Sequence, residues 1–422
     1  MQHAARTDIG LRRANNQDSY SVALAGSAEL FQQKGHLFVV ADGMGAHAAG
    51  ELASRIATDV VPLTYQKLAD RDPPDALVQA ICEANSQIHA RGQGEPEFKG
   101  MGTTCTALAL LPQGALVAHV GDSRAYRLRG TRIEQLTFDH SLLWEVRRTG
   151  QFGEEPLAGL IGKNIITRSL GPNPSVSVDL EGPLPIEVGD IFLLCSDGLS
   201  GQVKDDEIGA VLLCLPPDEA ADALVDLAKL RGGPDNITVI VVKVTAPQVA
   251  SNATAPTSAD EQTRPLPPVN PIVWVVLGVP FLAAIFFAAL RFFVEAAACL
   301  VLTGVAAIGS MLYRQRQRQT SSDPASVVLG RGPYASADCA PNASIVDRFR
   351  DIAEQLRQGA ADEHWPVDTA RFEQYCRQAS AAGQAGNYTE AARGYLRAIR
   401  LLMTQLKGRH PDMSTDHKDS VL

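Results

Sequence analysis

The sequence lacks several features that would place it in a specialised class of protein. Its seven cysteines are odd in number and scattered, and none forms a Cys-X-X-Cys pair, so they indicate reduced thiols and exclude a disulfide scaffold. It also lacks a basic excess, since 38 Lys and Arg stand against 47 Asp and Glu. The net charge of −9 argues against a nucleic-acid binder that works by neutralising phosphates. The opening residues, MQHAARTDIG, lack an apolar signal core, so we expect the N-terminal part to stay where it is made.

The length of 422 residues allows two or three domains, and the sequence pattern predicts that residues 1–243 form one of them. Short apolar runs of strand length alternate there with helical patterns. The runs between residues 104 and 136 follow one another too closely for crossover helices, which favours antiparallel pairing. Strands are expected at 37–41, 104–111, 115–120, 191–195 and 237–244, and helices at 50–68, 74–91, 206–214 and 218–230.

An apolar block follows this domain. Residues 244–270 are rich in Ala, Pro, Ser and Thr and are typical of a flexible linker. Residues 271–313 contain only two charged side chains and are long enough for a transmembrane hairpin, with spans at 272–290 and 296–313. The alternative is a pair of buried hydrophobic helices in a soluble domain.

Charge next to the block predicts its orientation. Arg314, Arg316 and Arg318 follow the second span, and the positive-inside rule places them in the cytoplasm. Because two spans return the chain to the same side, we expect residues 1–270 to be cytoplasmic as well. The predicted location is therefore the cytoplasmic (inner) membrane, with both flanking parts facing the cytoplasm.

The C-terminal part is predicted to be helical. A basic and polar connector at 314–344 precedes a helical segment at 345–408 and a tail at 409–422. The pattern GNYTEAARGYLRAIRLL at 386–402 resembles the second helix of a tetratricopeptide repeat. Only one such unit is visible, so an isolated helical hairpin and a partner-binding module of the repeat type both remain open.

Four Asp-containing turns stand where apolar runs end. They contain Asp42, Asp122, Asp197 and Asp235. Any one of them is explained by the ordinary use of Asp and Gly in turns. Together they can bring carboxylates from distant parts of the chain into one cleft, where hard cations such as Mg²⁺ or Mn²⁺ would relieve their repulsion. Two such ions sharing a carboxylate suit in-line displacement at phosphorus by a metal-held water.

These turns belong to a set of six motifs that resembles the metal-dependent protein phosphatase family, type 2C, in its bacterial form. The resemblance covers about residues 6–243 and implies an α/β/β/α sandwich of two antiparallel sheets flanked by helices. It also implies hydrolysis of phosphoserine and phosphothreonine in proteins. The motifs are Thr7–Asp18, Asp42–His47 with Gly50 and Glu51, Met101–Thr104, Gly121–Arg124, Ser196–Leu199 and Asp235–Thr238.

The resemblance implies a role for each matching residue. Asp42 would bridge two central Mn²⁺ or Mg²⁺ ions, with the carbonyl of Gly43 on one of them, and Asp197 and Asp235 would complete the other. Asp122, with Asp197, would hold a more weakly bound third ion. Arg13 would bind the substrate phosphate, and Asp18 would hold a coordinated water.

Three further positions carry expectations. His47 is a candidate general acid for the leaving oxygen, although it could equally pack against or cap the following helix. His140 is expected to be structural. Gln17 stands where the family commonly has Glu, and a neutral amide should weaken the second ion.

Gln17 leaves room for an alternative function. The preferred hypothesis is a membrane-anchored cytoplasmic phosphatase that acts on phosphorylated proteins and opposes a bacterial Ser/Thr kinase. The alternative is a catalytically weak or inactive scaffold that recruits phosphoproteins through residues 345–408. That segment could also bind a protein partner or sense a ligand that regulates the phosphatase.

Overall fold

The structure is a computed structural model that describes most of the chain outside the apolar block. The described residues are 1–46, 48–148, 165–246, 330 and 332–407. The chain divides into two units, 1–255 with 327–422 and 256–326, and every described residue belongs to the first. No helix within the described ranges is long and apolar enough to cross a membrane. The hairpin predicted over 271–313 lies outside those ranges.

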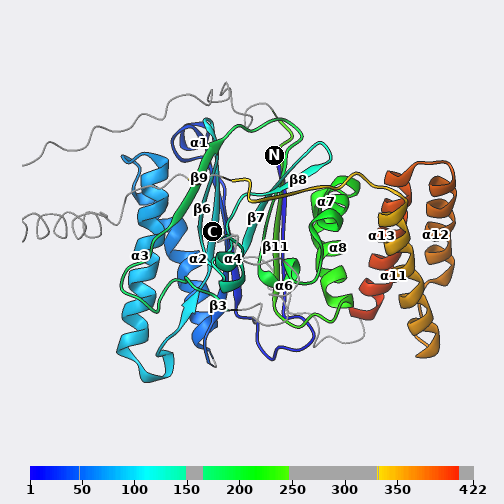
Figure 1. Cartoon of the computed structure of the whole chain (residues 1–422), viewed down its shortest axis with the longest axis horizontal. Helices are drawn as coiled ribbons and strands as arrows, with labels where there is room; N and C mark the ends of the chain where they lie inside the picture. The colour runs from blue at the N-terminus through cyan, green and yellow to red at the C-terminus, as the bar shows by residue number, and fades with distance from the viewer. Residues whose placement is uncertain (47, 149–164, 247–329, 331, 408–422) are drawn as a thin grey trace, which may run out of the picture. The chain divides into compact units, whose positions relative to one another are not determined.

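Two antiparallel sheets form the centre of the first unit (Figure 1). The first sheet has the order β1-β11-β10-β7-β8-β12, and the second has the order β2-β3-β5-β6-β9 with β4 paired to β3. The first contains β1 (Gln2–Asp8), β7 (Arg124–Arg129), β8 (Arg132–Gln135), β10 (Ile191–Cys195), β11 (Ile237–Lys243) and β12 (Ala335–Asp338). The second contains β2 (Asp18–Ala23), β3 (His36–Met44), β4 (Gly102–Thr103), β5 (Cys105–Leu111), β6 (Gly114–Val120) and β9 (Asp179–Leu184).

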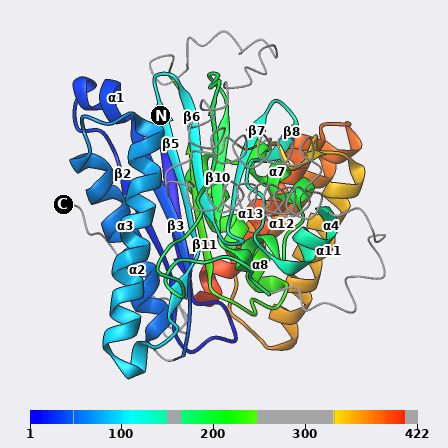
Figure 2. The same ribbon diagram turned by 60° about the vertical axis from the view of Figure 1, so that its left-hand side comes forward.

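Helices cover the outer faces of both sheets, so the expected sandwich of two antiparallel sheets flanked by helices is confirmed (Figures 1 and 2). On the second sheet these are α2 (Ala49–Lys67) and α3 (Pro73–Gly94), and on the first they are α7 (Asp205–Cys214) and α8 (Pro217–Leu230). The shorter helices are α1 (Ala28–Lys34), η1 (Pro96–Phe98), α4 (Leu142–Arg148) and α6 (Asp197–Ser200).

The central strands are apolar on both faces because each face is buried. In β3, Leu37 and Val39 pack with α2 and α3, whereas Phe38 and Val40 point to the opposite sheet. Side chains alternate along a strand, so a strand between two packed layers needs apolar residues at every position. This requirement produces the uninterrupted apolar runs in the sequence and fixes the ends of the strands, where the polar turns begin.

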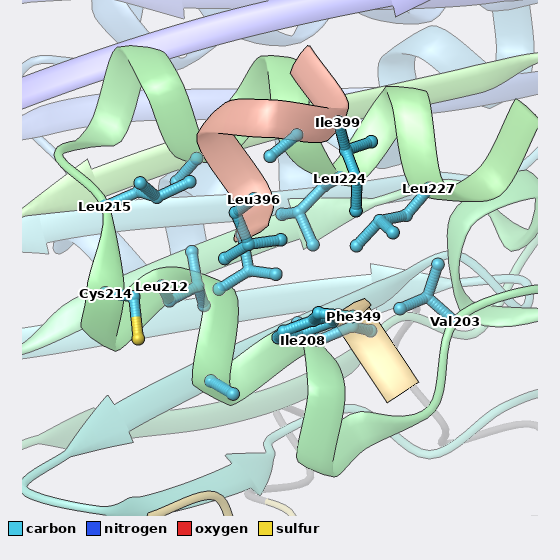
Figure 3. Close-up of a cluster of buried hydrophobic side chains, with 14 of the residues drawn as sticks. Val203, Ile208, Leu212, Cys214, Leu215, Leu224, Leu227, Phe349, Leu396 and Ile399 are labelled. Carbon is cyan, nitrogen blue, oxygen red and sulfur yellow. The ribbon is translucent and has the colours of Figure 1, made fainter. Parts of the chain in front are cut away.

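Three C-terminal helices follow, namely α11 (Ala343–Asp362), α12 (Thr369–Gln384) and α13 (Tyr388–Lys407). Of these, α11 and α13 pack on the outside of α7 and α8, and α12 packs on α13. α12 and α13 form a hairpin in which Gly394 allows close approach, because a Cβ there would lie 2.8 Å from that of Ala379. Leu396 and Ile399 of α13 and Phe349 of α11 join one buried cluster with the side chains of α7 and α8 (Figure 3). We call α11, α12 and α13 the C-terminal module.

Arginines of α13 attach the module to α8 and to the end of α7. Arg397 donates from Nε to Glu219 Oε2 at 2.9 Å, and Arg400 pairs with Asp222. Arg393 donates to the carbonyl of Cys214 at 2.7 Å. The module therefore packs against the two-sheet domain through both apolar burial and ion pairs. The connector predicted at 314–344 contains a strand, since β12 pairs with β8.

Candidate metal centre

The turn after β3 is held by the threonines of the Met101–Thr104 motif. Asp42 N–H donates to Thr104 Oγ1 at 2.9 Å, and Thr104 N–H donates back to the Asp42 carbonyl at 2.9 Å. Thr103 Oγ1 donates to the same carbonyl at 2.9 Å. Thr104 Oγ1 also shares a 2.8 Å hydrogen bond with Ser123, the neighbour of Asp122. This motif thus fixes the Asp42 turn relative to the Asp122 turn.

Gly43 is required by close backbone packing. A Cβ at this position would lie 2.1 Å from the carbonyl oxygen of Gly50 and 2.5 Å from that of Gln17. Gly43 N–H donates to the Gln17 carbonyl at 3.1 Å. The Gln17 side chain lies beside the same turn and donates to the Gly45 carbonyl at 3.3 Å. Gln17 therefore acts here as a donor to the backbone.

Ser196 joins the carboxylates of the two sheets. Asp18 and Asp42 lie opposite each other in the β2–β3 pairing. Ser196 Oγ, one residue before Asp197, donates to Asp18 Oδ2 at 2.7 Å and accepts from Thr238 N–H at 3.0 Å. A hydroxyl can donate and accept at once, so this one side chain connects β2 of the second sheet to β10 and β11 of the first.

Asn236 organises the loop that carries Arg13. Its Oδ1 accepts from Gln17 N–H at 2.8 Å, and its Nδ2 donates to the carbonyls of Ile9 at 2.9 Å and Asn15 at 3.1 Å. The loop is thereby fastened next to Asp235. This organising role was not predicted from the sequence, although Asn236 lies within one of the six motifs; its position in the Asp-Asn pair is the only signal.

The gathered carboxylates are buried or half-buried, and they raise one another's pKa. Burial first, and then the charges of Asp197 and Asp235, raises the pKa of Asp18 to about 7 despite hydrogen bonds that lower it. Burial and Asp197 raise the pKa of Asp122 to about 7, and burial and Asp235 raise that of Asp197 to about 6. The pKa of Asp42 also lies well above its ordinary value, because of burial and the Asp18 carboxylate. Taking these charges out of water is unfavourable unless a cation accompanies them.

The donor set fits a hard divalent cation. One carboxylate oxygen on each of Asp18, Asp122 and Asp197 is buried without a hydrogen-bond partner. Unsatisfied buried oxygens that belong to anions are the ligands that Mn²⁺ and Mg²⁺ prefer. No three His, Cys, Asp or Glu side chains of the described ranges already surround a common ion position. Asp42 instead hydrogen-bonds to Asp197, and these side chains would have to turn apart to take up an ion.

Arg13 pairs with one of the candidate ligands. Its Nη2 donates to Asp235 Oδ2 at 2.7 Å, and half of its side chain is exposed. The hydrogen bond and charge of Asp235 raise the pKa of Arg13 further above its ordinary value. The structure thus brings Arg13, Asp18, Asp42, Asp197 and Asp235 to one place, with Asp122 adjoining. His47 lies outside the described residues.

Comparison with known proteins agrees with this geometry. Residues 12–226 match the family model "Protein phosphatase 2C". The chain belongs to the protein phosphatase 2C family. A 2C-type phosphatase protein of Streptococcus pyogenes is 40% identical over 249 residues, which are 57% of this chain and 97% of that protein. A serine/threonine phosphatase of Listeria welshimeri is 37% identical over 245 residues, covering 56% of this chain and 94% of that protein.

A solved structure has the same fold over the same part of the chain. The Mycobacterium tuberculosis serine/threonine phosphatase PstP/Ppp matches with a TM-score of 0.51 and 36% identity, covering 58% of this chain and 99% of that chain. The 2C-type assignment makes this chain a metal-dependent Ser/Thr protein phosphatase, a class that uses Mn²⁺ or Mg²⁺. These matches cover little more than half of the chain, so they carry no information about the C-terminal module.

Proposed function

We propose that this phosphatase hydrolyses phosphoserine and phosphothreonine in proteins at the carboxylate centre between its two sheets. The observation that carries the proposal is the convergence of Asp18, Asp42 and Asp197, whose pKa values are all raised, with an unsatisfied buried oxygen on Asp18 and on Asp197. A protein keeps such an arrangement at a cost in stability, which a bound cation offsets. The 2C-type relatives and the motif order support the same chemistry.

Each residue has a proposed part in the reaction. Asp42, the Gly43 carbonyl, Asp197 and Asp235 would hold two ions, with Asp42 shared between them. When bound, the ions would neutralise the phosphoryl oxygens and lower the pKa of a coordinated water. Asp18 would hold that water by accepting its hydrogen bond.

Arg13 is proposed to bind the substrate phosphate. A guanidinium has five N–H donors in a rigid fork, so Arg13 can keep one on Asp235 and offer the others to a phosphoryl group. Asp122, with Asp197, is proposed to hold a third and weaker ion. His47 remains a candidate for protonating the leaving oxygen.

Turnover of a phosphothreonine peptide by the full chain tests the catalytic proposal. Activity should require Mn²⁺ or Mg²⁺, and Asp42→Asn should abolish it by removing the shared ligand. Asp59→Asn, an exposed carboxylate on α2, is the matched control and should retain full activity. Metal-independent turnover, or substantial activity in Asp42→Asn, would show that the centre is wrongly assigned.

Calorimetric titration with Mn²⁺ separates the enzyme from an inactive scaffold. The unsatisfied carboxylate oxygens favour the enzyme, because a protein that merely recruits phosphoproteins has no chemical reason to keep them together. We expect the intact chain to bind Mn²⁺ and Asp42→Asn to lose this binding. Absence of Mn²⁺ binding by the intact chain would favour the scaffold.

We further propose attachment to the cytoplasmic membrane through residues 271–313, with the phosphatase domain and the C-terminal module in the cytoplasm. The support is the apolar block and the three arginines that follow it. A chain without 271–313 should leave the membrane fraction, and retention there would contradict the proposal.

A Ser/Thr kinase that phosphorylates the same substrates is the proposed opposing partner, and residues 345–408 are the proposed site for a further protein. Affinity capture with the full chain, compared with a chain lacking 345–408, tests that site.

A further inference from the structure

A short stretch of chain before the C-terminal module lies across the adjacent edges of both sheets. We call residues 330–339 the arm; residue 331 lies outside the described residues, and the arm leads into α11 in Figure 1. Its β12 extends the first sheet by pairing with β8. At its other end, Gly330 N–H donates to the Leu180 carbonyl of β9, in the second sheet, at 2.6 Å. The buried Glu181 accepts hydrogen bonds from Gly332 N–H at 3.1 Å and from the Tyr334 hydroxyl.

Close packing fixes the arm at both ends. A Cβ at Gly330 would lie 1.4 Å from Glu181 Oε1, so only glycine permits this approach. Cys339 is fully buried, and a Cβ at Gly209 of α7 would lie 2.5 Å from its Sγ. The arm therefore sits in a site that is shaped for it.

Aromatic contacts connect the arm to the residues that follow β8. The ring of Tyr334 meets that of Phe138 at 5.5 Å between centroids, and Phe138 meets Trp144 of α4 edge-on at 5.4 Å. Arg124 lies over the Trp144 ring at 5.6 Å and donates to both oxygens of Asp139. Tyr334 thus packs against the segment that begins at Phe138.

That segment holds the turn carrying Asp122. His140 N–H donates to the Gly121 carbonyl at 2.7 Å, and His140 Nδ1 accepts from Gly121 N–H at 2.9 Å. Since Nδ1 accepts, the ring proton is on Nε2, which donates to Asp179 at 2.9 Å. Asp179 lies two residues before Glu181 in β9. The arm and the Asp122 turn are therefore connected along two routes, through Phe138 and through β9.

We propose that the arm is a positioning element for the Asp122 turn, and that Tyr334 is its main positioning residue. Tyr334 would act by holding Phe138 and Glu181, which in turn fix His140 and Asp179 around Gly121. This inference rests on the proposed function insofar as Asp122 is a metal ligand. It gives the arm an effect on the weakest ion site that is independent of the ligands themselves.

Hydrogen exchange and Mn²⁺ titration of the full chain test the proposal. Tyr334→Ala removes both the ring and the hydroxyl, whereas Tyr334→Phe keeps the ring on Phe138. Gly330→Val is a second disruptive variant, and it leaves Tyr334, Phe138 and Glu181 unchanged. Ser336→Ala, which changes an exposed side chain of the same arm, is the matched control.

Tyr334→Ala and Gly330→Val should speed backbone exchange at Gly121 and His140 by about fivefold, the effect of losing one aromatic pair. The weakest Mn²⁺ affinity should fall by a similar factor, and the tighter sites should not change. The exchange rates and Mn²⁺ affinity of Tyr334→Phe should lie closer to those of the unchanged chain, and those of Ser336→Ala should equal those of the unchanged chain.

Two results would overturn the inference. One is unchanged exchange at Gly121 and His140 in both disruptive variants. The other is faster exchange with no change in the weakest Mn²⁺ affinity, which would make the arm a support of the loop alone. Exchange is measured without metal or substrate, so failure of the catalytic proposal would leave the exchange result intact and be recognised separately.

Discussion

Replacing one carboxylate of the metal centre should stabilise the metal-free protein, and the gain should grow with pH. In the unfolded chain an Asp has a pKa of about 3.9. In the native chain burial and neighbouring carboxylates hold the pKa of Asp18 at about 7 and that of Asp42 well above the ordinary value. A group whose pKa is raised on folding contributes its stability at low pH and loses it as the pH rises through the native value. The window here runs from about pH 4 to about pH 7.

The magnitude follows from the size of the pKa change. A carboxylate displaced from about 3.9 to about 7 costs roughly 4 kcal/mol at neutral pH, since one pKa unit corresponds to about 1.4 kcal/mol. Asp42→Asn removes one member of a coupled set whose remaining members still repel one another. We therefore expect a gain that does not exceed that figure: the metal-free variant should be more stable than the parent at pH 7, and the difference should fall to almost nothing near pH 4.

Comparing Asp42→Asn with the parent removes a contribution to the pH dependence of stability that has the opposite sign. Burial lowers the pKa of His119 to about 3, so this histidine gains stability as the pH rises towards about 6.5 and would mask the carboxylates in the parent alone. Both chains keep His119, and its contribution cancels in the difference. Asp59→Asn, on the exposed side of α2, should show no pH-dependent difference.

The difference in unfolding free energy between parent and variant is measured by urea unfolding in the presence of a chelator. Circular dichroism monitors unfolding at several pH values in the same detergent. Saturating Mn²⁺ should reverse the order, because the parent should bind the ion and Asp42→Asn lacks the proposed shared ligand. A metal-free Asp42→Asn chain that is less stable than the parent at pH 7 would refute the electrostatic coupling. So would a difference that stays constant with pH.

Three further substitutions test other parts of the structure. Lys229→Met should cost about 3 kcal/mol or more in unfolding free energy, because the buried Lys229 donates to Asp8 at 2.8 Å and its loss leaves that carboxylate unpaired. Leu396→Ala should cost about 2–5 kcal/mol at the junction between the C-terminal module and α8, whereas Leu63→Ala, 56% exposed, should cost less than about 0.5 kcal/mol. Asp122→Asn should stabilise the metal-free chain by on the order of 1 kcal/mol at neutral pH while weakening one Mn²⁺ site, and calorimetry should show both effects.

The sequence predicts the buried elements well because burial imposes a pattern. The run predicted at 191–195 coincides with β10, and the helices predicted at 206–214 and 218–230 begin one residue later than α7 and α8. The strands at the sheet edges leave no such pattern. β1, with the sequence QHAARTD, and β12, with ASAD, are polar or small because they lie at the sheet edge, where part of each strand is exposed. Their pairing is determined by contacts with distant strands.

The same distinction applies to the metal centre. The carboxylates could be predicted because their chemistry is independent of the fold, and the described structure gathers Asp18, Asp42 and Asp197 together. The residues that hold them, such as Ser196 and Asn236, bind backbone groups far away in the chain. No local spacing reveals such a contact, so their roles emerge only from the structure.

The metal centre depends on how one sheet lies against the other. Asp18 and Asp42 belong to the second sheet, whereas Asp197 follows β10 and Asp235 precedes β11 in the first, so a small slide between the sheets would change the distances that an ion must bridge. Ser196 joins the sheets at the centre itself, and the arm joins them at their edges through β8 and β9. A divalent cation of this size tolerates ligand displacements of only a few tenths of an ångström. Contacts far from the carboxylates that fix the two sheets therefore contribute to metal affinity as directly as the ligands' own hydrogen bonds do.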